Sequence, residues 1–175
     1  EPVMAVSMGL WRPDPASWYY DQALSAGMPL THMSYVYLNA MRWILGTPLT
    51  VAAMANRKLE TGQGRVVEES CGALIRFTGG AFLSVTASYA GLEGLDDART
   101  QFVCTKGAVR VEVDGSITIF REGHIQHHVF TLEPSPMVRQ ADEFLDAINC
   151  RGLTRNPPDE SLWDIRIASA ISAAA

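Results

Sequence analysis

The chain has 175 residues, enough for one domain with a substantial buried core. Its 14 Lys and Arg residues are scattered among 19 Asp and Glu, and the net charge of -5 excludes a nucleic-acid partner. The sequence contains no run of 18 apolar residues, so we expect no membrane span, and we expect no signal peptide. With 47% hydrophobic and 19% charged residues, the chain is rich in apolar groups. We therefore expect a partner domain or a second copy to cover part of its surface.

The three cysteines are Cys71, Cys104 and Cys150, an odd number spaced far apart, and each lies in an apolar segment. This pattern predicts buried free thiols in a reducing compartment, with a disulfide or a metal role as the alternative. We accordingly expect a cytoplasmic protein. The chain also opens without Met, which suggests a fragment or a processed start.

The first element expected is a strand over residues 3–10, closed by two prolines in WRPDP. A short helix or turn follows over residues 16–24 and contains three consecutive aromatic residues, Trp18, Tyr19 and Tyr20. Such a triplet predicts a lid packed over a core. The alternative is a loop that closes over a ligand.

A helix is predicted between Gly27 and Gly46, in the segment GMPLTHMSYVYLNAMRWILG. Thr31 is a candidate N-cap, and Gly46 can adopt the left-handed conformation that ends a helix. One face at helical spacing is predicted to join the core, and it consists of Met33, Tyr37, Met41 and Ile44.

A second stripe of this helix mixes polar and apolar groups and consists of His32, Val36, Asn39 and Trp43. One interpretation is a helix flank packed under a loop. The other is that the stripe lines a pocket.

The middle of the chain is predicted to form most of a β-sheet. Residues 49–56 read as a strand, followed by the polar loop KLETGQG and by a hairpin whose two runs flank Gly79 and Gly80. In the second run both alternating faces are partly apolar or small. A sheet with helices on one face and a partner on the other would show this pattern.

Further strands are predicted after residue 100, with turns at Lys106-Gly107 and Asp114-Gly115. The acidic stretch from Gly91 to Arg99 reads as a solvated loop, and HIQHHVFTL reads as an exposed or edge strand. On such a strand His124 and His128 lie about 13 Å apart, too far to share a zinc ion.

The end of the chain is predicted to be helical. Apolar residues recur at helical spacing in VRQADEFLDAINC, and a last helix begins at Pro158 and Asp159. The order of elements predicts an α+β fold, with an open, largely antiparallel or mixed sheet of about six to eight strands and helices on one face.

Common catalytic and nucleotide-binding signatures are missing from the sequence. It contains no GxGxxG, GxxxxGK[ST], HExxH or GxSxG. Nothing ties a histidine to a particular Ser or Cys as a nucleophile would require. From the residues alone, the prediction ends at a soluble α+β domain that pairs through its sheet.

The order of several segments, however, resembles a known family. WYYD, AGMPLTHMSYVYLNAMRWILGTPLTV, VVEESCGALIRFTGGAFLSVTASY, TKGAVRVEV and FLDAI together look like the C-terminal domain of the Gfo/Idh/MocA family of NAD(P)-dependent sugar and inositol oxidoreductases. The resemblance implies a separate N-terminal Rossmann domain that binds the cofactor and carries a catalytic lysine. It implies that the present chain supplies a sheet used in oligomer contacts and a helix that faces the substrate.

One departure from the family concerns this helix. Aligned on RWILG, the family has a histidine as acid/base and, three residues later, an aspartate, whereas this sequence has Val36 and Asn39. Valine cannot transfer a proton, and asparagine can only hydrogen-bond. His32, one turn earlier and about 6 Å back along the helix, is the candidate substitute for this acid/base.

The resemblance therefore implies that residues 1–175 are the substrate-binding and oligomerisation domain of a larger nicotinamide-dependent oxidoreductase acting on a sugar-like or polyol substrate. The fragment alone is expected to be inactive and to bind no cofactor or metal, while NAD or NADP binds the parent. The substrate-binding candidates are Trp18, His32 and Asn39. The expected partners are the Rossmann domain, a small-molecule substrate and further copies joined through the sheet face. The alternative is a non-catalytic binding or assembly module that has lost dehydrogenase activity.

Overall fold

The structure is a computed structural model that describes residues 1–14, 16–25, 29–58, 68–91, 97–112, 114–131 and 133–175. The side chains of Gln22 and of residues 31–37 also lie outside this description. Most of the predicted loop KLETGQG falls outside the described residues, as do Glu93 and Asp96 of the predicted acidic loop.

An eight-stranded sheet forms the frame of the domain, in the order β2-β3-β4-β1-β5-β6-β7-β8. Only β1 and β4 pair in parallel among the described strands, and the other six neighbouring pairs are antiparallel. The predicted fold class is thus confirmed. The strands are β1 (Pro2–Leu10), β2 (Pro48–Asn56), β3 (Ser70–Phe77), β4 (Phe82–Ser88), β5 (Asp97–Cys104), β6 (Gly107–Val111), β7 (Ile117–Arg121) and β8 (His124–His128).

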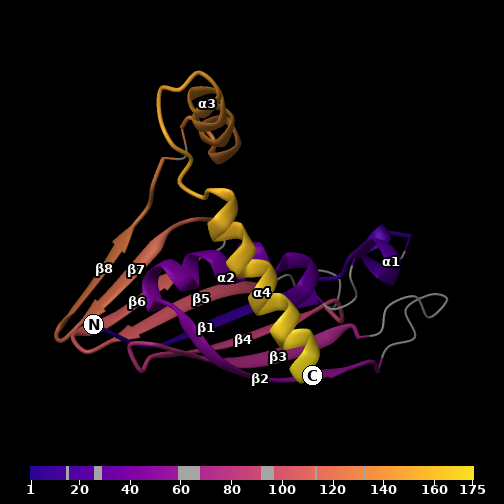
Figure 1. Cartoon of the computed structure of the whole chain (residues 1–175). Helices are drawn as coiled ribbons and strands as arrows, with labels where there is room; N and C mark the ends of the chain where they lie inside the picture. The colour runs from indigo at the N-terminus through magenta and orange to yellow at the C-terminus, as the bar shows by residue number, and fades with distance from the viewer. Residues whose placement is uncertain (15, 26–28, 59–67, 92–96, 113, 132) are drawn as a thin grey trace.

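The helices occupy three places around this sheet. Helices α2 and α4 lie across one of its faces, while the 3-10 helix η1 and α1 project at the far end of β1 (Figure 1). Helix α3 stands away from the sheet above the other elements (Figure 1). No helix in the described part of the chain has the length and apolarity needed to cross a membrane. The helices are η1 (Trp18–Tyr20), α1 (Gln22–Ser25), α2 (Pro29–Leu45), α3 (Pro136–Ile148) and α4 (Pro158–Ala174).

The tight turns lie at glycines where the sequence predicts them. Gly80, in the β3–β4 hairpin, has a φ of 86°, and Gly107, the first residue of β6 after the turn from β5, has a φ of 147°. A Cβ on Gly107 would lie 2.2 Å from the backbone oxygen of Phe120, so this turn admits no side chain.

The core lies between the sheet and the two crossing helices. In β4, the alternating side chains of Leu83, Val85 and Ala87 face the helices and are at most 1% exposed. Helix α2 contributes a buried stripe to the same cluster, and α4 contributes Ile167 and Ile171. Because both helices use their apolar faces here, their rotation about their own axes is fixed. The stripe of α2 consists of Leu30, Leu38, Met41 and Leu45.

The predicted start and core face of α2 need correction. The helix begins at Pro29, so the prediction that Thr31 caps it is wrong, and proline's fixed φ suits the first helical position. Of the predicted core face, Met33 and Tyr37 lie outside the described side chains, Met41 is buried as predicted, and Ile44 is 48% exposed. The helix is turned so that Leu45 takes the place expected for Ile44. The predicted end is confirmed, because Gly46 has a φ of 97° and donates its N–H to the Arg42 carbonyl at 2.9 Å.

Two further expectations change with the structure. The segment expected as a loop up to Arg99 already enters β5 at Asp97, which pairs with Leu10. Cys71 is buried, but Cys150 is exposed after α3, so the prediction that all three thiols are buried is wrong. The exposed edge position of the histidines is confirmed, since β8 forms one edge of the sheet and all its residues are exposed.

Candidate functional site

An aromatic cluster closes the end of the sheet where β1 and β4 finish. Tyr89, 1% exposed, lies at its centre, with the Trp11 ring edge-on at 5.0 Å and the Tyr20 ring at 5.6 Å. Tyr19 stacks on Tyr89 with an interplanar angle of 14°. Tyr19 and Tyr20 come from η1, so the predicted lid packed over a core is confirmed for these two rings.

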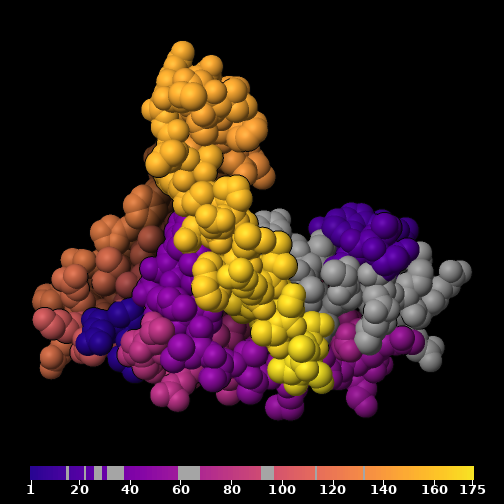
Figure 2. Space-filling model, in the orientation of Figure 1, coloured from indigo at the N-terminus to yellow at the C-terminus, as the bar shows by residue number. Residues whose placement is uncertain are grey.

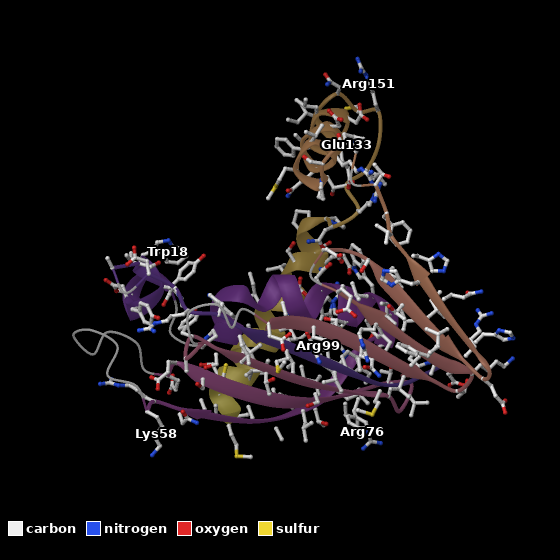
Figure 3. All side chains as sticks on the ribbon, turned by 180° about the vertical axis from the view of Figure 1, so that it is seen from behind. Trp18, Lys58, Arg76, Arg99, Glu133 and Arg151 are labelled. Carbon is white, nitrogen blue, oxygen red and sulfur yellow. The ribbon has the colours of Figure 1, made fainter. Side chains whose placement is uncertain are left out.

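Trp18 is the exposed member of the aromatic triplet. Its ring meets Tyr19 edge-on at 4.7 Å, and the residue is 49% exposed. Figure 3 shows it on the projecting part of the chain at the end of the sheet. A half-exposed indole held edge-on by a packed tyrosine can contact an apolar or sugar face.

Two ionisable groups near this end are held in their neutral forms. Burial raises the pKa of Tyr20, whose hydroxyl donates to the Pro13 carbonyl at 3.5 Å. Burial also raises the pKa of the Cys71 thiol to about 11, against the opposing effect of a backbone hydrogen bond from Leu30. A thiol with this pKa is not a nucleophile at neutral pH, so Cys71 serves the core.

The polar part of α2 forms hydrogen bonds with the C-terminal segment of the chain. Asn39 donates from Nδ2 to Asp164 Oδ2 at 2.8 Å and to Asn156 Oδ1 at 3.0 Å. Asn156 in turn donates to the Ser161 hydroxyl at 3.1 Å. Both hydrogens of the Asn39 amide are therefore used, and Oδ1 is the atom that can accept a hydrogen bond from a hydroxyl.

One turn further along α2, Arg42 meets two carboxylates of α4. It forms an ion pair with Glu160, and its Nε lies 3.8 Å from Asp164 Oδ1. The Arg42 and Asp164 side chains are only 11% and 2% exposed. Neither Arg42 Nε nor Asp164 Oδ1 has a hydrogen-bond partner within the described part of the chain. Since Arg42 is neutralised here, it is not available to bind a phosphate group.

Burial sets the charge state of Asp164. It raises the pKa of this carboxyl, and the Asn39 hydrogen bond and the Arg42 charge oppose the shift without cancelling it. The carboxyl thus holds its proton to a higher pH than an exposed aspartate. Its hydrogen bond to Asn39 ties α2 to α4.

The three predicted substrate residues come from two elements of the domain. Trp18 is in η1, whereas Asn39 lies ten residues into α2, about 15 Å along the helix from Pro29. The side chains of His32 and Val36 lie outside the description, so the structure tests neither. Among the described residues, no group of three His, Cys, Asp or Glu is placed to hold a metal ion.

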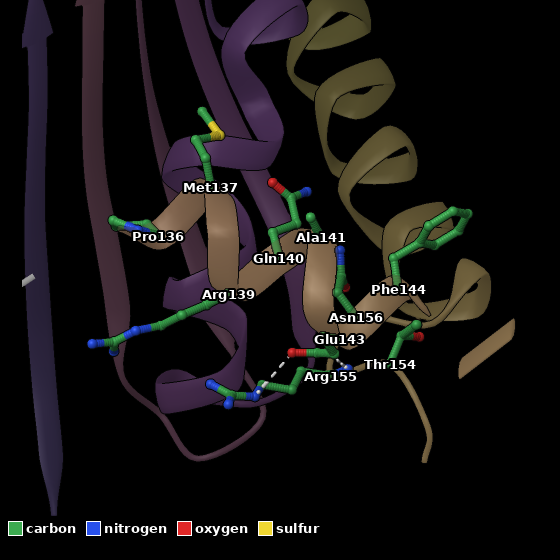
Figure 4. Close-up of a pocket in the computed structure, with 10 residues that line it drawn as sticks. All are labelled: Pro136, Met137, Arg139, Gln140, Ala141, Glu143, Phe144, Thr154, Arg155 and Asn156. Carbon is green, nitrogen blue, oxygen red and sulfur yellow. Dashed lines mark hydrogen bonds and ion pairs between the residues drawn. The ribbon is translucent and has the colours of Figure 1, made fainter. Parts of the chain in front are cut away.

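A hollow of about 770 Å³ lies beside the contact between Asn39 and Asn156, between α3 and residues 154–156 (Figure 4). Asn156 lines it and also accepts the hydrogen bond from Asn39. Glu143 and Arg155 form an ion pair of 3.2 Å at its edge (Figure 4). The other lining residues are Pro136, Met137, Arg139, Gln140, Ala141, Phe144 and Thr154.

Sequence reasoning singled out Asn39 but missed its partners. Asn156 and Asp164 lie 117 and 125 residues further along the chain, and no local pattern reports such a contact. A signal was nevertheless present in α4, because Asp164 stands one turn before Ala168 and two turns before Ile171 on the buried face. A carboxylate on a buried face needs a partner, and a polar α2 stripe could have supplied it.

Comparison with protein families identifies the domain. The family model described as GFO/IDH/MocA C-terminal domain matches residues 3–110, more than half of the chain. The chain therefore belongs to this family, as the resemblance predicted. A comparison with curated proteins gives no match.

Solved structures share the fold along the whole chain. The aldose-aldose oxidoreductase from Caulobacter crescentus complexed with glycerol is 22% identical with a TM-score of 0.83, over 99% of this chain and 53% of that one. Levoglucosan dehydrogenase in complex with NADH is 17% identical with a TM-score of 0.83, over 100% and 56%. The WlbA dehydrogenase from Bordetella pertussis in complex with NADH and UDP-GlcNAcA is 17% identical with a TM-score of 0.77, over 99% and 52%. The chain thus spans about half the length of the structures that it matches.

The first prediction concerns the direction of the Asn39 hydrogen bonds. Asn39→Asp would place a second carboxylate where an N–H now lies 2.8 Å from Asp164. We expect a loss of about 1–3 kcal/mol in the free energy of unfolding at pH 7, because a donor is lost and two carboxylates are crowded together. Urea denaturation measures it. Adding Asp164→Asn restores one donor opposite one carboxylate, so the double variant should regain most of the loss. No gain from the second substitution would contradict this assignment.

The second prediction concerns pH. Because the pKa of Asp164 is raised in the folded state above its ordinary value of 3.8, the contribution of this group to stability is complete below pH 3.8 and declines as the pH rises through the folded value. The free energy of unfolding of the unmodified chain, taken relative to Asp164→Asn, should therefore fall between pH 3.8 and neutrality. Urea denaturation at a series of pH values tests this. A difference that grows with pH would mean that Arg42 outweighs burial.

Proposed function

We propose that this chain is the substrate-binding and oligomerisation domain of a nicotinamide-dependent oxidoreductase that acts on a sugar-like or polyol substrate. The match of residues 3–110 to the family's C-terminal domain carries the proposal. The fold it shares with the NADH complexes of levoglucosan dehydrogenase and WlbA supports it. In this proposal, an N-terminal Rossmann domain of the parent protein binds NAD or NADP. The fragment alone is inactive.

The described residues are suited to hold a polyol rather than a dinucleotide. Asn39 Oδ1 can accept from a substrate hydroxyl, and the half-exposed Trp18 ring can cover an apolar sugar face. Arg42 is paired with Glu160 and Asp164, which leaves the cofactor's pyrophosphate to the other domain. When bound there, the nicotinamide would accept a hydride from a carbinol carbon.

The second candidate is a non-catalytic binding or assembly module. It is favoured by valine at position 36, where the family has its acid/base, and by the engagement of both Asn39 amide hydrogens with α4 and its preceding segment. An amide with an engaged Nδ2 can position a hydroxyl but cannot take its proton. In the enzyme proposal, the proton must therefore pass to His32 or to the other domain.

The open face of the sheet is the proposed oligomer contact. Apolar side chains project from it on neighbouring strands, among them Val6, Met54, Leu74 and Phe82 at 40–81% exposure. Small residues between them leave a hollow of about 260 Å³, lined by Gly72, Ser84 and Thr86 among others. A face with this composition needs cover by a partner. The three free cysteines agree with a reducing compartment, and we propose the cytoplasm.

The third prediction tests the enzyme proposal. The parent protein should bind NAD(H) or NADP(H) in a fluorescence or calorimetric titration and reduce the cofactor with a sugar or polyol, while the 175-residue chain binds none. Trp18→Ala should raise KM about tenfold, since roughly 1–3 kcal/mol of stacking is lost. The control is Phe130→Ala, a ring of similar exposure two residues after β8. A parent that binds no cofactor would refute the enzyme proposal and leave the assembly module.

The fourth prediction tests the oligomer contact. Sedimentation of the chain should show an oligomer, because neighbouring strands expose apolar side chains on this face. Leu74→Arg should dissociate it, since a charge would be buried at its centre. Leu24→Arg changes a leucine in α1 that is 66% exposed, against 54% for Leu74, and should leave the oligomer intact. A chain that is still monomeric at about 100 µM would count against the contact, because this concentration is well above the Kd of specific complexes.

A further inference from the structure

The edge of the sheet at β2 is long and open. In the described part of the chain, β2 is the outermost strand on this side and pairs only with β3. Natural sheets protect such an edge with a short strand, with charged side chains or with a proline inside the strand. The nine residues of β2, PLTVAAMAN, include no charge, and the one proline comes first. The register shift lies between Pro48 and Thr50, so residues 51–56 offer a regular row of backbone donors and acceptors to a further strand.

An apolar groove lies between β2 and α4. Helix α4 contacts β2, and its C-terminal end, in yellow, reaches this edge of the domain (Figure 2). The groove has a volume of about 140 Å³, and its most buried lining residues are Ile75 and Ile167, at 1% and 6% exposure. Small-molecule sites usually measure roughly 300–1,000 Å³, so this groove is of a size for one apolar side chain. The other lining residues are Pro48, Leu49, Thr50, Val51, Trp163, Arg166 and Ala170.

Arg166 supplies a positive charge at this groove. Its guanidinium carbon lies 5.2 Å from the centroid of the Trp163 ring, and both side chains line the groove. No carboxylate in the described part of the chain forms an ion pair with Arg166, whereas Arg42 is paired with Glu160 and Asp164. The Arg166 guanidinium is therefore available to bind an anion beside an apolar groove.

An open edge strand, a side-chain groove and a cation together suit an extended peptide. A strand added to β2 would lie about 4.8 Å from it, and a side chain on its helix side would point toward the groove. Successive side chains of a strand point to opposite faces, and the next one on the same face lies about 7 Å further along. A groove for one side chain with a cation at its wall therefore fits a residue that carries both an apolar side chain and a main-chain carboxylate. Only the last residue of a peptide has both.

We propose that β2 and α4 form a binding site for the C-terminal end of an extended segment of a partner protein, whose last residue is apolar. The segment adds a strand to the edge of β2, its last side chain fills the groove, and its terminal carboxylate binds Arg166. The charge of Arg166 argues against a second copy that pairs through its own β2, because that strand carries no carboxylate. The inference goes beyond the proposed function and does not rest on it.

Calorimetric titration of defined peptides into the chain tests the proposal. The probe is the acetylated peptide Lys-Thr-Val-Thr-Leu with a free C-terminal carboxylate, and the control is the same peptide with a C-terminal amide. The carboxylate form should bind at least about tenfold more tightly, because the amide lacks the charge that meets Arg166. Arg166→Gln should remove this preference. The matched variant Arg151→Gln, which changes another exposed arginine, should keep it. Amide hydrogen exchange of residues 48–56 should slow when the carboxylate peptide binds.

Three results would overturn the peptide site. The first is equal binding of the two peptides, or no binding of either at about 1 mM, where even weak specific contacts are occupied. The second is a preference for the carboxylate that survives Arg166→Gln. The third is protection of residues 48–56 that rises with protein concentration in the absence of peptide, because a second copy would then pair with β2. A parent that binds no cofactor would refute the oxidoreductase and leave this site untouched.

Discussion

The arrangement of this domain depends on one buried carboxylate. Asp164 lies at the crossing of α4 and α2, 2% exposed, and takes its hydrogen bond from Asn39 and its nearest positive charge from Arg42. Leaving such a group without partners would cost several kcal/mol, so the two helices cannot slide past one another freely. The polar contact thereby fixes the register of α2, while Leu38, Met41 and Leu45 fix its rotation against the sheet.

This constraint also bears on function. An aspartate in place of Asn39 would crowd a second carboxylate against Asp164, whereas asparagine supplies the donor that Asp164 needs. The residue that departs from the family's pattern is thus the one that fits its neighbour in this chain. It can still offer Oδ1 to a hydroxyl, so Asn39 is suited to position a substrate but not to exchange a proton with it.

Much of the fold could be predicted from local patterns. Alternation of side chains in β3 and β4 and the turns at Gly80 and Gly107 predict strands and register, because glycine accepts backbone conformations that other residues avoid. The start of α2 and the exposure of Ile44 were not predictable in this way. The sequence of α2 contains two overlapping apolar stripes that could face the core, and contacts with the sheet and α4 determine which one is buried.

The candidate site was only partly visible in the sequence. Asn39 stood out by its position on α2, yet its partners lie more than a hundred residues away. The amphipathic pattern of α3 was equally plain, but a pattern reports that a face needs cover and not what covers it. The two faces of the sheet have separate assignments: the face under α2 and α4 forms the core, and the open face is proposed for contacts with other copies.

A crystal structure of the parent protein with NAD or NADP bound tests the central claim most directly. The account predicts that the nicotinamide ring lies against the side of α2 that carries Asn39, with Asn39 Nδ2 still bonded to Asp164. A cofactor bound away from α2, or an Asn39 released from α4 in the complex, would contradict it.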